Sequence, residues 1–145
     1  MKSINEYLIN KQTKEKISGS QYTVQQFISE LRKIGLNVSL PHDKDIDFGD
    51  YIYIYPANKK QRFPYVKFMY NVYGYDRRPM DVFMINNVED GIDLRLNSST
   101  TYRYNDIDFT KYNIITDLDS GRKIYFLDDK FIEFFKILFK DYLNK

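Results

Sequence analysis

Cysteine and tryptophan are absent from the 145 residues of this sequence, and histidine occurs once. Without cysteine, the chain has no disulfide bond, no thiolate nucleophile and no cysteine-ligated zinc site. A serine hydrolase needs a base beside its nucleophile, and His42 is the only histidine that could supply one. We interpret His42 as an exposed loop residue, so neither hydrolase chemistry nor a histidine-rich metal site is expected.

Glycine and proline are scarce, with six and four residues, and the glycines never fall in a GxGxxG or GxxxxGK phosphate-binding pattern. Long apolar runs are missing as well, because none approaches the ~20 residues that span a bilayer. The N-terminal sequence is too polar for a secretory signal. These absences predict a soluble, cytoplasmic protein without a cofactor.

The chain is nevertheless long and apolar enough to form a core, with 43% hydrophobic residues. We predict a single α+β domain over residues 1–145, in which residues 1–20 form a loosely attached N-terminal arm. Tyrosine (14) and phenylalanine (11) are abundant, as in AT-rich genomes. Small proteins of this composition are typical of phages and mobile elements.

Two segments combine helical periodicity with helix start signals. Thr23 and Gln26 have the spacing of a capping box, and Gly35 stands where a left-handed residue ends a helix. Asp128 is placed to cap a second helix, which carries a wide apolar arc. The residues of that arc are Phe131, Ile132, Phe134, Phe135, Leu138, Phe139, Tyr142 and Leu143. We expect both helices, about 23–34 and about 128–143, to pack on one face of a sheet.

Most of the remaining chain has strand character, with turn signals between short segments rich in Tyr, Ile, Val and Phe. The predicted strands are 51–55, 65–73, 80–88, 92–97, 100–105, 112–117 and 122–127, and the alternation of Leu36, Val38 and Leu40 is compatible with a further short strand. Asp90-Gly91 and Asp119-Ser120-Gly121 have the chemistry of hairpin turns. The prediction is therefore an antiparallel β-meander sheet of about six or seven strands that both helices cover.

The segment HDKDIDFGD carries the densest set of oxygen ligands. Asp43, Asp45 and Asp47 have the spacing that opens an EF-hand loop, but Phe48 stands where that loop needs its turn glycine. We interpret the segment as a solvated acidic loop. The alternative is a weak cation site that a partner completes, and no metal site is assigned.

Residues 51–80 concentrate positive charge, with six Lys or Arg against one Asp, although the net charge of the chain is only +2. If the isoleucines and valines of the first two long strands meet the helices, their tyrosines form a second face. Tyrosines flanked by cations can stack on bases, and Tyr, Met and Arg are also enriched in protein interfaces. The structural alternative is that the tyrosines are half-buried within the fold. The predicted binding surface comprises Tyr51, Tyr53, Tyr55, Lys59, Lys60, Arg62, Lys67, Met69, Tyr73, Tyr75, Arg77 and Arg78.

The leading hypothesis is a small non-enzymatic binding protein, of inhibitor or adaptor type, that occludes or modulates a macromolecular partner. A protein is the favoured partner, and a membrane partner is not expected. The first alternative is a single-stranded nucleic-acid-binding protein. The second is a metal-dependent nuclease or phosphodiesterase that uses Asp81 and Asp93, with Asp106 and Asp108 nearby in sequence. Aspartates that alternate with apolar residues are also typical of the solvent face of a strand, so we assign no catalytic residue.

Overall fold

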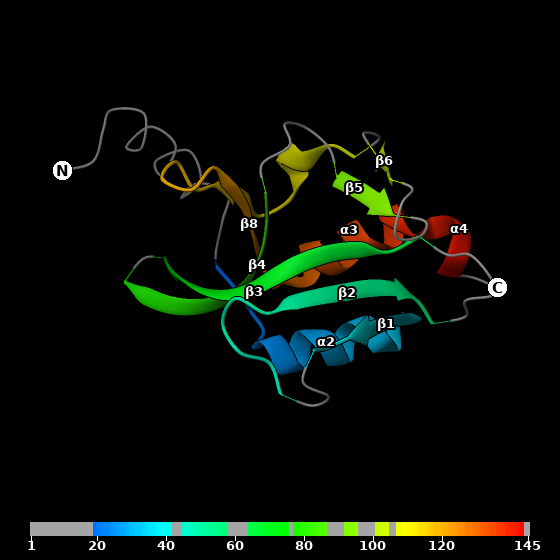
Figure 1. The fold of residues 1–145 in the computed structure, drawn as a ribbon, viewed down its shortest axis with the longest axis horizontal. Helices are drawn as coiled ribbons and strands as arrows, with labels where there is room; N and C mark the ends of the chain where they lie inside the picture. Colours follow the sequence, from blue (N-terminus) through cyan, green and yellow to red (C-terminus); the bar gives the residue numbers. More distant parts are fainter. Residues whose placement is uncertain are drawn as a thin grey trace.

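A computed structural model describes residues 19–41, 45–57, 64–75, 77–86, 92–95, 101–104 and 107–143. Its centre is a six-stranded antiparallel sheet, and two further strands form a separate sheet (Figure 1). The order in the large sheet is β1 (Leu36–Ser39), β2 (Tyr51–Pro56), β3 (Val66–Tyr75), β4 (Arg78–Asn86), β8 (Arg122–Phe126) and β7 (Ile114–Thr116). The small sheet pairs β5 (Ile92–Arg95) with β6 (Thr101–Tyr104). The helices are α2 (Val24–Lys33), α3 (Asp129–Leu138), α4 (Lys140–Leu143) and the short 3₁₀ helix η1 (Phe109–Lys111). The α+β prediction, with an antiparallel sheet and helices packed on it, is confirmed.

Strands β1 to β4 form an antiparallel meander, but the next strand along the chain, β5, does not pair with β4. Asp90-Gly91 does not connect two paired strands, because β8 occupies the edge of β4 and β5 pairs with β6. Both β4 and β8 carry continuous apolar runs, and such runs are favoured where both faces of a strand are buried. Pairing these two strands places both in the interior of the sheet. The second expected hairpin does form between β7 and β8, where Gly121 has a φ of 72°.

The main core lies between one face of the large sheet and the two longer helices, and α3 lies behind the sheet in the view of Figure 1. Ile52 and Phe68 point into this core and are fully buried. Phe131 of α3 stacks on Phe27 of α2 with ring centroids 5.1 Å apart, and on Tyr125 of β8 at 5.0 Å. Both helices therefore cover the same face, as the sequence predicts.

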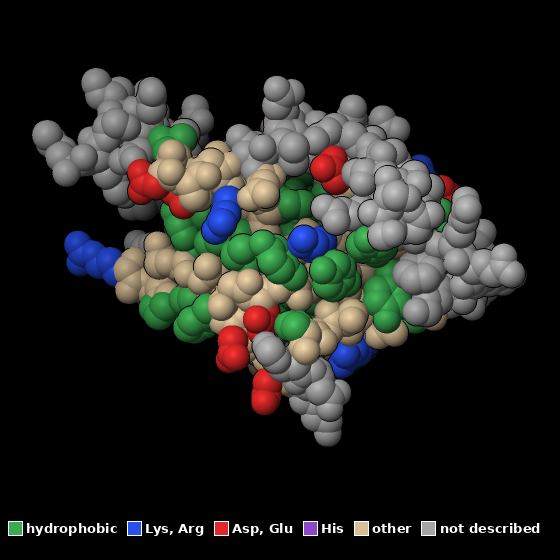
Figure 2. All heavy atoms as spheres, in the orientation of Figure 1, with side chains coloured by type: hydrophobic (Ala, Val, Ile, Leu, Met, Phe, Trp, Pro, Cys, Tyr) green, Lys and Arg blue, Asp and Glu red, His purple; other side chains and the backbone are tan. Residues whose placement is uncertain are grey.

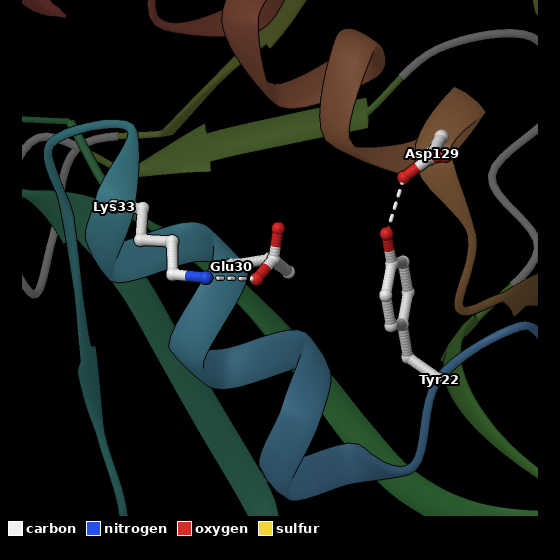
Figure 3. A network of polar contacts seen from close by, with 4 residues as sticks. All are labelled: Tyr22, Glu30, Lys33 and Asp129. Carbon is white, nitrogen blue, oxygen red and sulfur yellow. Dashed lines mark hydrogen bonds and ion pairs between the residues drawn. The ribbon is translucent and has the colours of Figure 1, made fainter.

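Side chains satisfy the helix ends as expected. The Thr23 hydroxyl oxygen accepts from the Gln26 amide at 3.2 Å, the Gln26 side chain accepts from the Thr23 amide at 2.9 Å, and Gly35 follows α2 with a φ of 98°. The Tyr22 hydroxyl donates to the Asp129 carboxylate at 2.5 Å and so links the starts of α2 and α3 (Figure 3). This hydrogen bond is the main cause that raises the pKa of Tyr22 to about 12.

Figure 3 also shows the exposed ion pair between Lys33 and Glu30, whose atoms are 2.8 Å apart. A solvent-exposed pair of this kind contributes little to stability.

The prediction that Tyr142 lies on the buried arc of the C-terminal helix is wrong, because its side chain is 37% exposed. The helix does not continue in phase to residue 143. Phe139 leaves the helical conformation, with φ −110° and ψ 23°, and α4 starts after it as a separate short helix. Leu143 still packs on the core. None of the helices in the described ranges has the length and hydropathy needed to cross a bilayer.

Gly35 offers a direct test of the end of α2. Alanine at this positive φ is strained, so we expect Gly35→Ala to lower the free energy of unfolding by about 1–2 kcal/mol. Gly74→Ala is the matched control, because Gly74 lies in β3 without a positive φ and an added Cβ would meet nothing within 4 Å. The control should leave stability unchanged or raise it by about 0.5–1 kcal/mol in urea unfolding. Equal losses in both variants would contradict this account.

The buried Asp128 makes stability depend on pH. Its carboxylate accepts from the Phe131 amide at 2.9 Å and from the Asn113 side chain. Burial nevertheless raises the pKa of Asp128 above its ordinary value. The protonated form is therefore favoured in the folded state, and the resulting stability is lost as the pH rises through the folded pKa.

Asparagine in place of Asp128 would keep the capping oxygen but could not ionise. We therefore expect Asp128→Asn to gain stability relative to the wild type as the pH rises from about 4, the ordinary pKa of an aspartate, through the raised pKa of Asp128. Urea unfolding of both proteins across this range measures the difference between their free energies of unfolding. If the variant loses the Asn113 contact, that loss lowers its stability by the same amount at every pH. A difference that stays constant or falls with pH would show that the carboxyl is not destabilised by burial.

Candidate functional site

The sheet has a second face, directed away from α2 and α3, which we term the outer face. Tyr51 and Tyr53 project from it and are 45% and 37% exposed, whereas Ile52 and Ile54 between and beside them are fully buried. This alternation is the one predicted for β2, and it leaves both tyrosine rings accessible to solvent. Tyr55 lies on the same face but is half-buried.

An apolar row crosses the outer face. Strand register pairs Tyr51 with Met69, Met69 with Met84, and Met84 with Ile124, so that four neighbouring strands each contribute one side chain. Met84 and Ile124 are buried in a second hydrophobic cluster of the fold, whereas Met69 is half-buried and Tyr51 is exposed. A polar row runs beside it. Tyr53 pairs with Lys67 at one end of that row.

The polar row continues on the other strands, because Asn86 of β4 pairs with Arg122 of β8. A pocket with a volume of about 210 Å³ lies where the two rows meet. Figure 2 shows Lys and Arg side chains among hydrophobic ones over the course of β3 in this view. The residues that line the pocket are Tyr51, Lys67, Met69, Met84, Ile85, Asn86, Asp93 and Arg122.

The charged groups of Lys67 and Arg122 in this pocket each contact an uncharged side chain. The Lys67 ammonium lies 4.2 Å from the centre of the Tyr51 ring, in the geometry of a cation–π contact. Arg122 Nη1 lies 3.9 Å from the Met69 sulfur. Within the described part of the chain, neither cation forms an ion pair with a carboxylate. Asp93 lines the pocket but interacts with another group of the protein. The pocket therefore presents positive charge that the described carboxylates do not neutralise.

The structure separates other members of the predicted surface from this pocket. Arg77 and Arg78 are exposed at the turn between β3 and β4, ten and eleven residues along the chain from Lys67 and thus roughly 30 Å away. Tyr73 is half-buried, with its ring 6.4 Å from that of Phe126. The side chain of Tyr75 is not described, and Lys59, Lys60 and Arg62 lie outside the described residues.

The aspartates of the nuclease hypothesis do not come together. Asp81 lies on the helix side of the sheet, where its carboxylate accepts from the Tyr70 hydroxyl at 2.8 Å and from the Val24 amide at 2.7 Å. Burial is the first cause that raises the pKa of Tyr70, and this hydrogen bond adds to it. Asp93 lines the pocket of the outer face instead. Asp108 accepts from the Thr110 amide at the start of η1, and Asp106 lies outside the described residues.

The acidic loop closes on the sheet. The Asp47 amide donates to the Asp50 carboxylate at 2.8 Å, and the Gly49 amide donates to the Tyr70 carbonyl at the same distance. Asp45 and Asp47 are exposed, while His42 and Asp43 lie outside the described residues. In the described ranges, no group of three or more His, Cys, Asp or Glu residues is placed to hold a metal ion.

Sequence reasoning missed Met84, Asn86 and Arg122 as pocket residues. Their orientation follows from strand alternation, since Arg122 shares the outer face with Ile124. Their neighbourhood does not, because the pairing of β4 with β8 joins segments that are distant in sequence.

Comparisons of this chain with protein family models, with curated proteins and with solved structures found no match. The chemistry of the outer face is therefore the basis on which a function is assigned.

Asp81 has a structural role that a substitution can test. Alanine would leave the Val24 amide and the Tyr70 hydroxyl without their acceptor, so we expect Asp81→Ala to lower the free energy of unfolding by about 2–3 kcal/mol. The control Asp45→Ala removes an exposed loop carboxyl and should change stability by less than about 0.5 kcal/mol. Urea unfolding measures both, and a neutral Asp81→Ala would show that this carboxylate does not stabilise α2.

Proposed function

We propose that this protein recognises a protein partner through the outer face of its sheet and acts by occluding or modulating that partner. One observation carries the proposal. Tyr51 and Tyr53 are exposed beside a pocket in which Lys67 and Arg122 have no ion pair within the described residues. The proposal assigns no reaction to the chain.

The residue types of the pocket favour a protein partner. Tyrosine, methionine and arginine are enriched at the centres of protein interfaces, and Tyr51, Met69, Met84 and Arg122 line this one pocket. Methionine side chains adapt to irregular partner surfaces because the thioether chain is flexible and polarizable.

The size of the pocket also supports a macromolecular partner. Its volume of about 210 Å³ is below the ~300–1,000 Å³ that is usual for sites of small-molecule ligands and cofactors. A single side chain that projects from a larger surface suits this volume better than a free cofactor does.

Single-stranded nucleic acid fits the same face less well. Base stacking requires a free aromatic face, and because the Lys67 ammonium lies over one face of the Tyr51 ring, only the opposite face remains for a base. The Tyr53 ring packs against Tyr65 with centroids 5.8 Å apart. The cations that would track a phosphate backbone are also divided between the pocket and the distant Arg77 turn.

The test is affinity capture from a lysate of the organism that encodes the chain, with a double Tyr51→Ala and Tyr53→Ala variant. We expect recovery of the specific protein partner to fall by about tenfold or more, because exposed tyrosines of this kind act as anchor residues. Tyr142→Ala is the matched control, since Tyr142 is as exposed as Tyr53 but belongs to α4, and it should not alter recovery.

Each lysate is divided, and one half is treated with nuclease before capture. Undiminished recovery with the double variant would overturn the proposed surface. Recovery that depends on intact nucleic acid would assign the face to nucleic-acid binding instead.

A further inference from the structure

The geometry points to one specific role for the pocket: it receives the carboxylate of a single aspartate or glutamate side chain of the protein partner. This inference rests on the function proposed above and adds the chemistry of recognition. It depends on the polar row, on the charge balance of the pocket and on its apolar floor.

Three hydrogen-bond donors of different strands converge on the pocket. Asn86 of β4 pairs with Arg122 of β8, and Lys67 of the neighbouring strand β3 lines the same pocket. Adjacent strands are about 4.8 Å apart, so the donors extend over roughly 10 Å, a span that long Lys and Arg side chains can close. They offer an ammonium, an amide and a planar guanidinium, and the guanidinium fork matches the two oxygens of a carboxylate.

The charges of the pocket favour an anion. Lys67 and Arg122 contribute two positive charges, whereas Asp93 interacts with another group of the protein. A carboxylate would place its negative charge between these two cations. Because neither cation has an ion pair among the described residues, binding a carboxylate breaks no such pair.

The apolar row supplies the rest of the subsite. Met69 and Met84 form a floor against which the methylene groups of an acidic side chain can pack. The contact of Lys67 with the Tyr51 ring holds the ammonium near the pocket before the partner arrives. This preorganisation reduces the entropy cost of binding.

The experiment is a titration of the ¹⁵N-labelled full chain with acetyl-Leu-Glu-Leu-amide, followed by NMR. We expect saturable shifts of the backbone amide signals of Lys67, Asn86 and Arg122. The affinity for the neutral peptide acetyl-Leu-Gln-Leu-amide should be lower by about tenfold or more, because this peptide lacks the charge that both cations recognise. Separate titrations with inorganic phosphate and with oligothymidylate identify competing anions.

Two variants test the cations independently. Arg122→Gln and Lys67→Met should each weaken binding of the glutamate peptide by about tenfold. Arg32→Gln removes the same charge from an exposed position on α2 and should leave binding unchanged. Amide spectra of each variant before titration establish that the fold is retained, and Lys67→Met keeps the test decisive if Arg122→Gln does not fold.

Several results would overturn the inference. They are the absence of saturable shifts, equal affinity for the two peptides, equal effects of Arg122→Gln and Arg32→Gln, or tighter binding of phosphate or oligothymidylate at the same amides. The inference and the proposed function can fail separately. If Arg122→Gln captures the partner normally while the Tyr51 and Tyr53 variant does not, the function stands and the carboxylate subsite is refuted. If the glutamate peptide binds but the tyrosine variant loses no partner, the subsite stands and the proposed function is refuted.

Discussion

The arrangement of this protein depends on the packing of Phe131. Its ring stacks on Tyr125 and Phe27 at 5.0 and 5.1 Å and meets the edges of Phe68 and Phe83 at 5.7 and 5.9 Å. One side chain thus joins α3 to α2 and to the three strands β3, β4 and β8. Aromatic pairs of this geometry contribute about 0.5–1.5 kcal/mol beyond the burial of their area. The cluster therefore determines which side of each central strand turns inward.

The packing of this core also determines which side chains lie on the outer face, because side chains of a strand alternate between two faces. Burial of Phe68 directs Lys67 and Met69 outward, and burial of Tyr125 does the same for Ile124. A slip of one residue in β3 would place Lys67 in the core and Phe68 in solvent. The core thus positions the residues that we assign to partner recognition.

Local features of the fold could be predicted from the sequence, whereas long-range neighbours could not. Strand alternation correctly placed Ile52 inward and Tyr53 outward, and the capping signals correctly located the start of α2. The pairing of β4 with β8 depends on which apolar strands bury each other, so Arg122 was missed although its own alternation is regular. The exposure of Tyr142 was mispredicted because the helix ends at Phe139, so that the apolar arc of α3 does not continue to Tyr142. The sequence predicted a tyrosine-lined face with Lys67 near its middle and basic loops at both ends, and of the predicted residues Tyr51, Lys67 and Met69 line the pocket.

The central claim is that the outer face is where the partner binds. Hydroxyl-radical footprinting of the chain, free and in complex with its captured partner, tests this claim most directly, since tyrosine and methionine side chains report their own accessibility. The account predicts that oxidation of Tyr51, Tyr53 and Met69 falls on binding while that of Tyr142 does not change. Protection of Tyr142 with unchanged oxidation of the outer face would contradict it.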